Sequence, residues 1–324
     1  MKLPSQKRIL YETGTVGYNA WSGSKAVNLP KDLSIMNRRG FTSTDNKGVP
    51  QVFLCQIDLY RVNNLTTPDG LTDLAHAQDF SSAISVGTVA NNWATKNAAI
   101  KWHAARASMW EKAGVKKAQL GAYTNAIRYN WDAANDTYYD PVNWYGVDFA
   151  GGTWDASVFA DGLDQDWQLK LIGTGTDQSA ATTSITALNF VHSYLQSRAT
   201  VPFDSNLESN AVPAAHSHLL SLMREGFEGA GTTSDDVITD VKTGQDNPPY
   251  DDITPSDTAN DITEAVEAGR AIIGIGGSGH ASIIVEIPFG IFQPKFTHFD
   301  SDTTNEVAGL DFAVTVLDIY PMQG

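Results

Sequence analysis

The 324-residue sequence has a single cysteine, Cys55, and no long apolar run. A lone cysteine excludes an intrachain disulfide and a zinc site built from cysteines. No run approaches the roughly 18 apolar residues that a membrane-spanning helix needs. Residues 1–17 lack the apolar core of a secretory signal peptide. We therefore expect a protein that is made in a cytoplasm.

Basic residues are scarce in the second part of the chain. Residues 1–130 carry 16 Lys and Arg against eight Asp and Glu, whereas residues 131–324 carry six against 29. This polarity predicts two differently exposed faces, of which the basic one can meet an anionic surface such as lipid headgroups or nucleic acid. Ordinary solvated charge is the alternative explanation.

The chain has few long helical patterns and many turn signals, which is typical of short strands joined by loops. The clearest strand is Gln51–Val62, in which Phe53, Cys55, Ile57 and Leu59 share one face with a period of two. Further strands are expected at residues 167–172, 271–275, 281–287 and 310–319, and Pro321 ends the last of them.

Two helices are predicted. The long one covers residues 93–113, capped by Asn91 or Asn92 at its start and by Gly114 at its end. The short one covers Asn260–Ala268, and residues 216–225 form a weaker third candidate. The long helix should bury a stripe of Ala98, Trp102, Ala105, Met109 and Ala113.

These elements predict a mainly β fold built from two consecutive jelly-roll β-barrels, because a single sandwich rarely needs 324 residues. The N-terminal barrel, with the basic N-terminal segment, is expected over residues 1–165. The C-terminal barrel is expected over residues 166–324. The helix near 93–113 falls in the first barrel and the helix near 260–268 in the second.

Three ordered segments carry a resemblance to a known family. They are Leu33–Phe41 followed by the strand from Val52 to Val62, the stretch Asn92–Ala98 continuing through Trp102 to Trp110, and Asp246–Asp251 in an acidic loop. Together they resemble the double jelly-roll major capsid proteins of small bacteriophages with single-stranded DNA, including lipid-containing ones. The resemblance covers most of the chain in order, but residues 131–166 and 176–240 match none of its motifs.

The resemblance implies a structural coat protein of the virion rather than an enzyme. Members of the family form homotrimers of pseudo-hexagonal outline that tile an icosahedral shell. The implied partners are the chain itself, neighbouring trimers, and minor capsid and vertex proteins. Sequence-specific nucleic-acid binding is not implied, and neither is a cofactor, a metal or a catalytic residue. The basic residues Lys2, Lys7, Arg8, Arg38 and Arg39 would face inward, toward an internal membrane or a neighbouring tile.

Two motifs suggest enzyme chemistry but lack its context. Gly274–Gly279 spells the G-x-G-x-x-G dinucleotide fingerprint, yet residues 281–287 after it are strand-like, where a nucleotide site needs a helix. Cys55 and His280 occur in the chain order of papain-like proteases. A catalytic thiolate is usually activated at a helix N-terminus or beside a base, whereas Cys55 lies in the middle of a strand on its apolar face, so a buried structural thiol is the favoured interpretation.

Several polar groups could in principle bind metals. His216 and His218 form one pair, for which loop histidines are the simpler interpretation. Two acidic groups, neither with EF-hand spacing, leave structural calcium as a minor alternative to solvated loops. They are Asp161, Asp164 and Asp166, and Asp300, Asp302, Asn305 and Glu306.

Aromatic residues gather among acids at Tyr138, Tyr139, Trp144, Tyr145 and Trp154. Aromatics with paired carboxylates are also typical of a carbohydrate-binding or carbohydrate-active β-sandwich, which is the second hypothesis for function. Packing at subunit interfaces is the competing explanation, because Tyr and Trp are enriched there.

Overall fold

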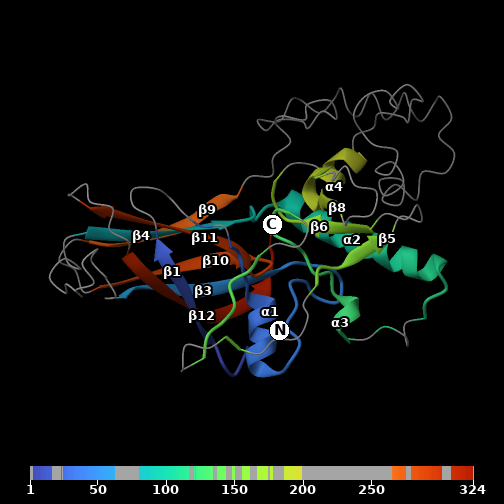
Figure 1. Cartoon of the computed structure of the whole chain (residues 1–324). Coiled ribbons are helices and arrows are strands. Elements are labelled where there is room, and N and C mark those ends of the chain that lie inside the picture. The colour runs from blue at the N-terminus through green and yellow to red at the C-terminus, as the bar shows by residue number, and fades with distance from the viewer. Residues whose placement is uncertain are drawn as a thin grey trace.

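The computed structural model describes most of the chain outside one long central segment. The described residues are 3–16, 23, 25–62, 80–116, 120, 122–133, 137–143, 148–149, 155–160, 166–173, 176–177, 186–198, 265–274, 279–300 and 308–323. They form a β-sandwich and, at one end of it, a smaller unit that contains the longest helix (Figure 1).

The sandwich consists of two four-stranded antiparallel sheets. Sheet A has the order β1-β12-β3-β10 and sheet B the order β2-β11-β4-β9. Their strands are β1 (Arg8–Val16), β2 (Val27–Asn28), β3 (Gln51–Val62), β4 (Phe80–Thr88), β9 (Val266–Ile273), β10 (His280–Pro288), β11 (Ile291–Asp300) and β12 (Ala308–Pro321).

The pairing order of these strands is that of one jelly roll. Among the eight sandwich strands, the first pairs with the last, the second with the seventh, the third with the sixth and the fourth with the fifth. The chain is thus one long antiparallel ribbon. The ribbon is rolled up so that β12 also pairs with β3 and β11 with β4, which is jelly-roll connectivity.

Alternation of side chains along the strands builds the core of the sandwich. Phe53, Cys55, Ile57 and Leu59 of β3 are fully buried between the sheets. The neighbouring strand β12 buries Leu310, Phe312, Val314 and Val316 in the same core. Two adjacent strands with this period of two give sheet A a continuous apolar inner face.

The chain between β4 and β9 contributes the smaller unit. It contains α2 (Trp93–Lys112), α3 (Ala122–Asn125), α4 (Phe190–Arg198) and a mixed sheet in the order β5-β6-β8-β7. The strands of that sheet are β5 (Val158–Ala160), β6 (Asp166–Lys170), β7 (Thr176–Asp177) and β8 (Thr186–Asn189). Trp102 of α2 donates a hydrogen bond from its indole nitrogen to the carbonyl of Phe190, 3.2 Å away, so the two longer helices share one core.

The turn between β10 and β11 joins the two cores. Phe289 has a φ of +61° and buries its ring between Tyr129 and Phe190, at centroid distances of 5.0 and 5.4 Å. Gly290 follows with a φ of +69°, and its carbonyl accepts a hydrogen bond from the amide of Leu29. A non-glycine residue such as Phe289 rarely adopts a positive φ. The packing of the Phe289 ring must therefore outweigh the backbone strain at this residue.

Residues 137–142 close one side of the sandwich. Tyr138 bridges to Ala26 beside β2, and Val142 bridges to Leu10 of β1. Both β1 and β2 are edge strands, whose free backbone groups could otherwise pair with another chain. Directly after β2, α1 (Leu29–Asn37) begins with Asn28 as its N-cap, whose side chain accepts a hydrogen bond from the amide of Lys31.

The strand and long-helix predictions are confirmed. The strand expected at 51–62 is β3, and β6, β9, β10 and β12 overlap the other four. The long helix runs from Trp93 to Lys112, with Asn92 as its N-cap and Gly114 at a positive φ after it. Of the predicted stripe, Ala98, Trp102 and Ala105 are buried and Met109 is half-buried, whereas Ala113 is exposed beyond the last turn.

The predicted division into two barrels at residue 165 does not follow the sheets. Strands from both sides of that boundary alternate within sheet A and within sheet B, and Val62 of β3 pairs with Gly309 of β12. The described residues therefore contain one jelly roll, with a mixed α/β insertion. Periodicity shows where a strand lies but not which distant strand it pairs with, so it cannot by itself place a boundary between two barrels.

The predicted short helix at 260–268 is wrong where it can be compared. Its last three residues, Val266–Ala268, begin β9 and pair with β4. Ile262 and Val266 are four apart, a spacing that fits one face of a strand as well as one face of a helix. Residues 260–264 and the candidate helix 216–225 lie outside the described residues.

The tight turn at Gly290 predicts a graded loss of stability. A Cβ at position 290 would lie 2.8 Å from Phe53 Cε2 and 2.8 Å from Pro30 Cδ. Gly290→Ala should therefore cost about 1–2 kcal/mol for the backbone and a further 1–3 kcal/mol for overpacking. Denaturant unfolding monitored by tryptophan fluorescence measures this loss.

The matched control is Gly114→Ala. Gly114 has a φ of +75°, and a Cβ added there would meet no atom within 4 Å, so only the backbone cost applies. Equal losses for the two variants would show that the turn at Gly290 is not tightly packed.

Candidate functional site

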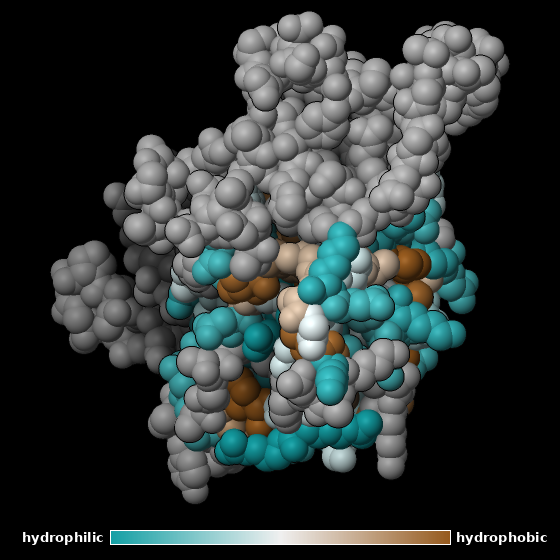
Figure 2. Space-filling view, turned by 90° about the vertical axis from the view of Figure 1, so that its right-hand side faces the viewer, coloured by the Kyte–Doolittle hydropathy of each residue, from teal (hydrophilic) through white to brown (hydrophobic). Residues whose placement is uncertain are grey.

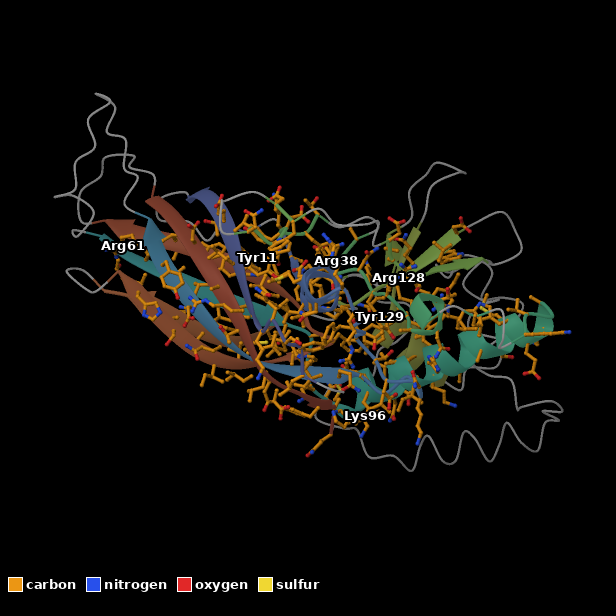
Figure 3. The ribbon with its side chains drawn as sticks, turned by 90° about the horizontal axis from the view of Figure 1, so that it is seen from below. Tyr11, Arg38, Arg61, Lys96, Arg128 and Tyr129 are labelled. Carbon is orange, nitrogen blue, oxygen red and sulfur yellow. The ribbon has the colours of Figure 1, made fainter. Side chains whose placement is uncertain are left out.

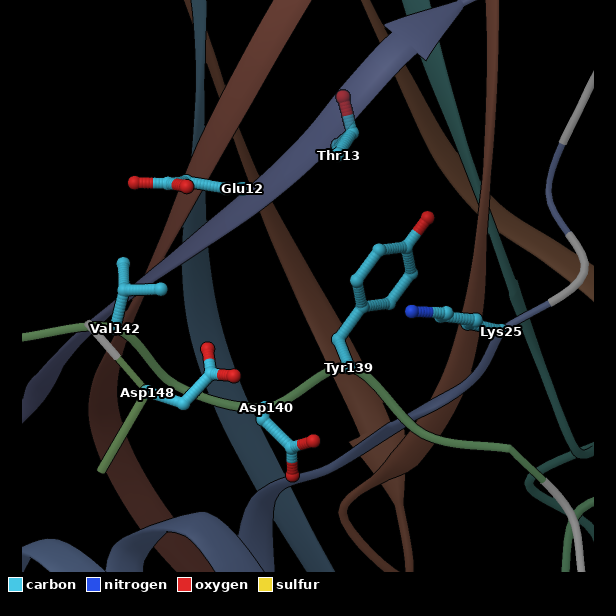
Figure 4. Close-up of a pocket in the computed structure, with 7 residues that line it drawn as sticks. All are labelled: Glu12, Thr13, Lys25, Tyr139, Asp140, Val142 and Asp148. Atoms are coloured by element: carbon cyan, nitrogen blue, oxygen red, sulfur yellow. The ribbon is translucent and has the colours of Figure 1, made fainter. Parts of the chain in front are cut away.

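A polar pocket lies where Tyr139, Asp140, Val142 and Asp148 meet β1. It has a volume of about 380 Å³ and is open to solvent. The carboxylates of Glu12, Asp140 and Asp148 contribute most of its charge, and the ammonium of Lys25 lies 5.5 Å from the centre of the Tyr139 ring (Figure 4). The pocket is therefore acidic, and Lys25 is the one cation among its lining residues. Its lining consists of Glu12, Thr13, Lys25, Tyr139, Asp140, Val142 and Asp148.

A buried tyrosine–aspartate pair lies close to this pocket. The hydroxyl of Tyr11 donates a hydrogen bond of 2.5 Å to Oδ2 of Asp32, and both side chains are fully buried. The other oxygen, Oδ1 of Asp32, has no hydrogen-bond partner. Tyr11 stacks on Phe312 at 4.9 Å and meets Tyr139 edge to face at 6.4 Å, so aromatic packing fixes the pair.

The environment of Asp32 raises its pKa. Burial is the main cause and brings the pKa of Asp32 to about 7, while the Tyr11 hydrogen bond and the charge of Lys31 act in the opposite direction. Burial and the nearby Asp32 also raise the pKa of Tyr11 well above its usual value. Asp32 is thus a buried carboxyl that changes charge near neutral pH.

An ion pair connects α1 to the pocket. The ammonium of Lys31 donates to Oδ1 of Asp140 at 2.8 Å. Asp140 in turn repels a charged Asp32 and contributes to the raised pKa of that residue. Residues 137–142, which cover the edges of β1 and β2, are therefore electrostatically coupled to the buried pair.

A second polar network lies on the outer face of sheet A. Asp58 is almost fully buried there and accepts a hydrogen bond of 2.8 Å from the side chain of Gln56. Arg8 and His280 approach Asp58 at 3.8 and 3.6 Å, and Arg8 also donates to the hydroxyl of Tyr60. These contacts tie β1, β3 and β10 together across the sheet, which is a structural role.

The insertion has its own buried polar cluster. Lys170 is 1% exposed and His192 is 5% exposed, and burial together with the charge of Lys170 lowers the pKa of His192 to about 4. Asn189 accepts hydrogen bonds from the amides of Val191 and His192 and so caps α4. Figure 3 shows the two cores from below, with Tyr11 in the sandwich and Tyr129 beside α2.

The structure separates Cys55 from His280. Cys55 points into the sandwich core and pairs with Val285 across the ladder, whereas His280 pairs with Tyr60 and lies on the outer face. The five-residue offset corresponds to about 16 Å along a strand. Burial also raises the pKa of the Cys55 thiol, so Cys55 is a structural core residue, as the sequence favoured.

The glycine-rich motif links two strands. Gly274 follows β9 and Gly279 precedes β10, so the motif is followed by a strand where a dinucleotide site requires a helix. Asp166 is exposed at the start of β6, and Asp300 ends β11. The remaining predicted ligands, at positions 161, 164, 216, 218, 302, 305 and 306, lie outside the described residues.

The part of the chain that the structure describes holds no group of three His, Cys, Asp or Glu side chains arranged to bind a metal ion. None of its helices is long and apolar enough to cross a membrane. Sequence reasoning missed the Tyr11–Asp32 pair, because the two residues come from a strand and a helix whose packing no local pattern shows.

The raised pKa of Asp32 predicts a pH-dependent stability. Between about pH 4 and 7 the folded chain keeps a proton on Asp32 that the unfolded chain releases. The free energy of unfolding should therefore fall as pH rises through this range, by at most about 4 kcal/mol, and level off above it. Urea unfolding at a series of pH values measures the slope.

Asp32→Asn should remove this contribution to the pH dependence. Compared with the wild type at the same pH, the variant should therefore be more stable at pH 8 than it is at pH 5. The control is Asp148→Asn, which neutralises an exposed carboxylate of the nearby pocket. A wild-type slope that survives in Asp32→Asn would assign the pH dependence to other groups.

Comparisons with protein-family models, with curated proteins and with solved structures find no match to this chain.

Proposed function

We propose that this chain is a structural coat protein, which assembles through copies of itself into a closed shell. The observation that carries the proposal is the jelly roll formed by both ends of the chain. This architecture recurs in viral capsid proteins, although lectins and cupins share it. The capsid motifs of the sequence favour the first of these three classes.

The architecture suits a shell protein for a physical reason. A rigid sandwich with a central core can bear contacts on several sides, and symmetric contacts allow one chain to cover a closed surface. The helices and strands of the insertion lie at one end of the sandwich (Figure 1), and the flanking strands β4 and β9 pair with each other, so that the insertion does not interrupt the sheets. The described surface of that end is mainly hydrophilic, with a few separate apolar areas (Figure 2).

The number of barrels in each chain bears on the kind of shell that we propose. A trimer of pseudo-hexagonal outline would need two barrels from each chain, and the described residues supply one. We therefore propose a shell of single-barrel subunits, in which the insertion supplies the additional contacts.

The basic N-terminal segment is the proposed inward-facing surface. The start of β1 and the end of α1 are held together by two hydrogen bonds between Gln6 and Asn37, of 2.8 and 3.1 Å. This arrangement brings four exposed cations to one region of the surface, where anionic headgroups or an acidic neighbouring copy can bind. They are Lys7, Arg8, Arg38 and Arg39.

The carbohydrate hypothesis receives less support from the described residues. Sugar binding by stacking needs an exposed aromatic face. Tyr139, the aromatic residue of the acidic pocket, is only 8% exposed and packs against Tyr11 and Phe312. Residues 144, 145 and 154 lie outside the described residues.

Self-association tests the proposed function. The purified full chain should elute as an oligomer in size-exclusion chromatography with light scattering, and electron microscopy of that fraction should show shells. Cys55→Ala should still assemble, because the thiol is buried in the core and remote from the surface. A monomer at every salt concentration would contradict the proposal.

A further inference from the structure

The two sides of the sandwich differ in how their edges are covered. On one side, residues 137–142 bridge to the β1 and β2 edges. On the other side lie β10, the edge of sheet A, and β9, the edge of sheet B. Among the described residues, no strand pairs with the outer edge of either β9 or β10.

Apolar side chains are exposed at this second side. Ile284 of β10 is 61% exposed, and Ile272 and Val266 of β9 are 60% and 49% exposed. These are the three most exposed large hydrophobic side chains of the described residues. A groove of about 380 Å³ runs between the two strands and includes Val266, Ala268, Ile284 and Pro288. Such a surface is typical of an interaction site.

The two edge strands differ in their suitability for pairing. The ladder of β9 with β4 shifts register between Val86 and Gly87, and a bulge of this kind disfavours further pairing. By contrast, β10 pairs with β3 over nine residues without a shift, and Pro288 is its last residue. A long, regular and apolar edge such as β10 is a template for another strand.

The sequence of β10 is complementary to itself. In an antiparallel pair centred on Ile284, this residue faces its own copy and Ile283 faces Val285 of the second copy. Ala281 then faces Ile287, so every inward pair is apolar. Glu286 faces Ser282 and is diagonal to His280 of the second copy, so that no like charges are opposed.

We infer that β10 is the contact between two copies of this chain, joined about a two-fold axis into one continuous sheet. The contact extends sheet A across both subunits and covers Ile284 and the adjoining groove. The inference deepens the proposed shell function, on which it rests, by naming one of the contacts between subunits.

Site-directed crosslinking tests this contact. Cysteine pairs bridge only at short Cα separations, and Ile284→Cys would place two thiols opposite each other across the axis. Mild oxidation of this variant should therefore give a covalent dimer on a non-reducing gel. Cys55 does not interfere, because it is buried in the core.

Ser282→Cys is the matched control, since it lies on the same exposed face of β10. In the inferred register, two copies of residue 282 are about 13 Å apart, too far for a disulfide. A dimer with Ile284→Cys and none with Ser282→Cys supports the contact.

The outcomes separate this inference from the proposed function. If the chain forms shells but Ile284→Cys gives no dimer, the β10 contact is wrong while the shell function stands. If Ser282→Cys gives a covalent dimer and Ile284→Cys does not, the antiparallel register centred on Ile284 is wrong. If light scattering finds only monomers and neither variant crosslinks, both proposals fail.

Discussion

The position of β12 is the constraint on which the rest of the structure depends. This last strand lies between β1 and β3 and pairs with both, so the sheet that contains the first strand cannot form until the end of the chain arrives. Contacts between residues so distant in sequence carry a high loop-closure cost. Burial of apolar side chains offsets this loop-closure cost, because β3 and β12 together supply most of the apolar inner face of sheet A.

The long insertion between β4 and β9 is placed so that it does not prevent β12 from pairing with β1 and β3. It leaves after β4 and returns at β9, two strands that pair directly with each other, so its length does not separate the sheets. Its own core is attached to the barrel through Phe289, which extends from the β10–β11 turn into a cluster with Tyr129 and Phe190. The strained backbone at Phe289 and the close packing at Gly290 mark the point where the two cores meet.

Local patterns in the sequence predicted the elements better than their partners. The strand at 51–62 and the helix after Asn92 follow from periodicity and capping, which act over a few residues. The sheet order depends on pairings such as Val62 with Gly309, and no local pattern contains that information. The segment around Val266 was misassigned because a spacing of four residues fits both a helix and a strand.

The polar site could not be predicted from local patterns either. Asp32 is an ordinary acid in the first turn of a helix, and it becomes unusual only when β1 brings Tyr11 over it in the core. In the same way, Ile284 and Val285 lie on opposite faces of β10, one exposed and one buried, but no local pattern shows that β10 is the edge of its sheet. Cys55 was the exception, because alternation along its own strand already indicated a buried thiol.

Electron cryo-microscopy of the assembled particle is the most direct test of the central claim that the chain is a single-barrel shell protein. We expect one eight-stranded jelly roll for each chain, with β12 between β1 and β3, in a closed shell of repeated copies. A particle with two barrels in each chain, or a chain that remains a monomer under every condition, would contradict it.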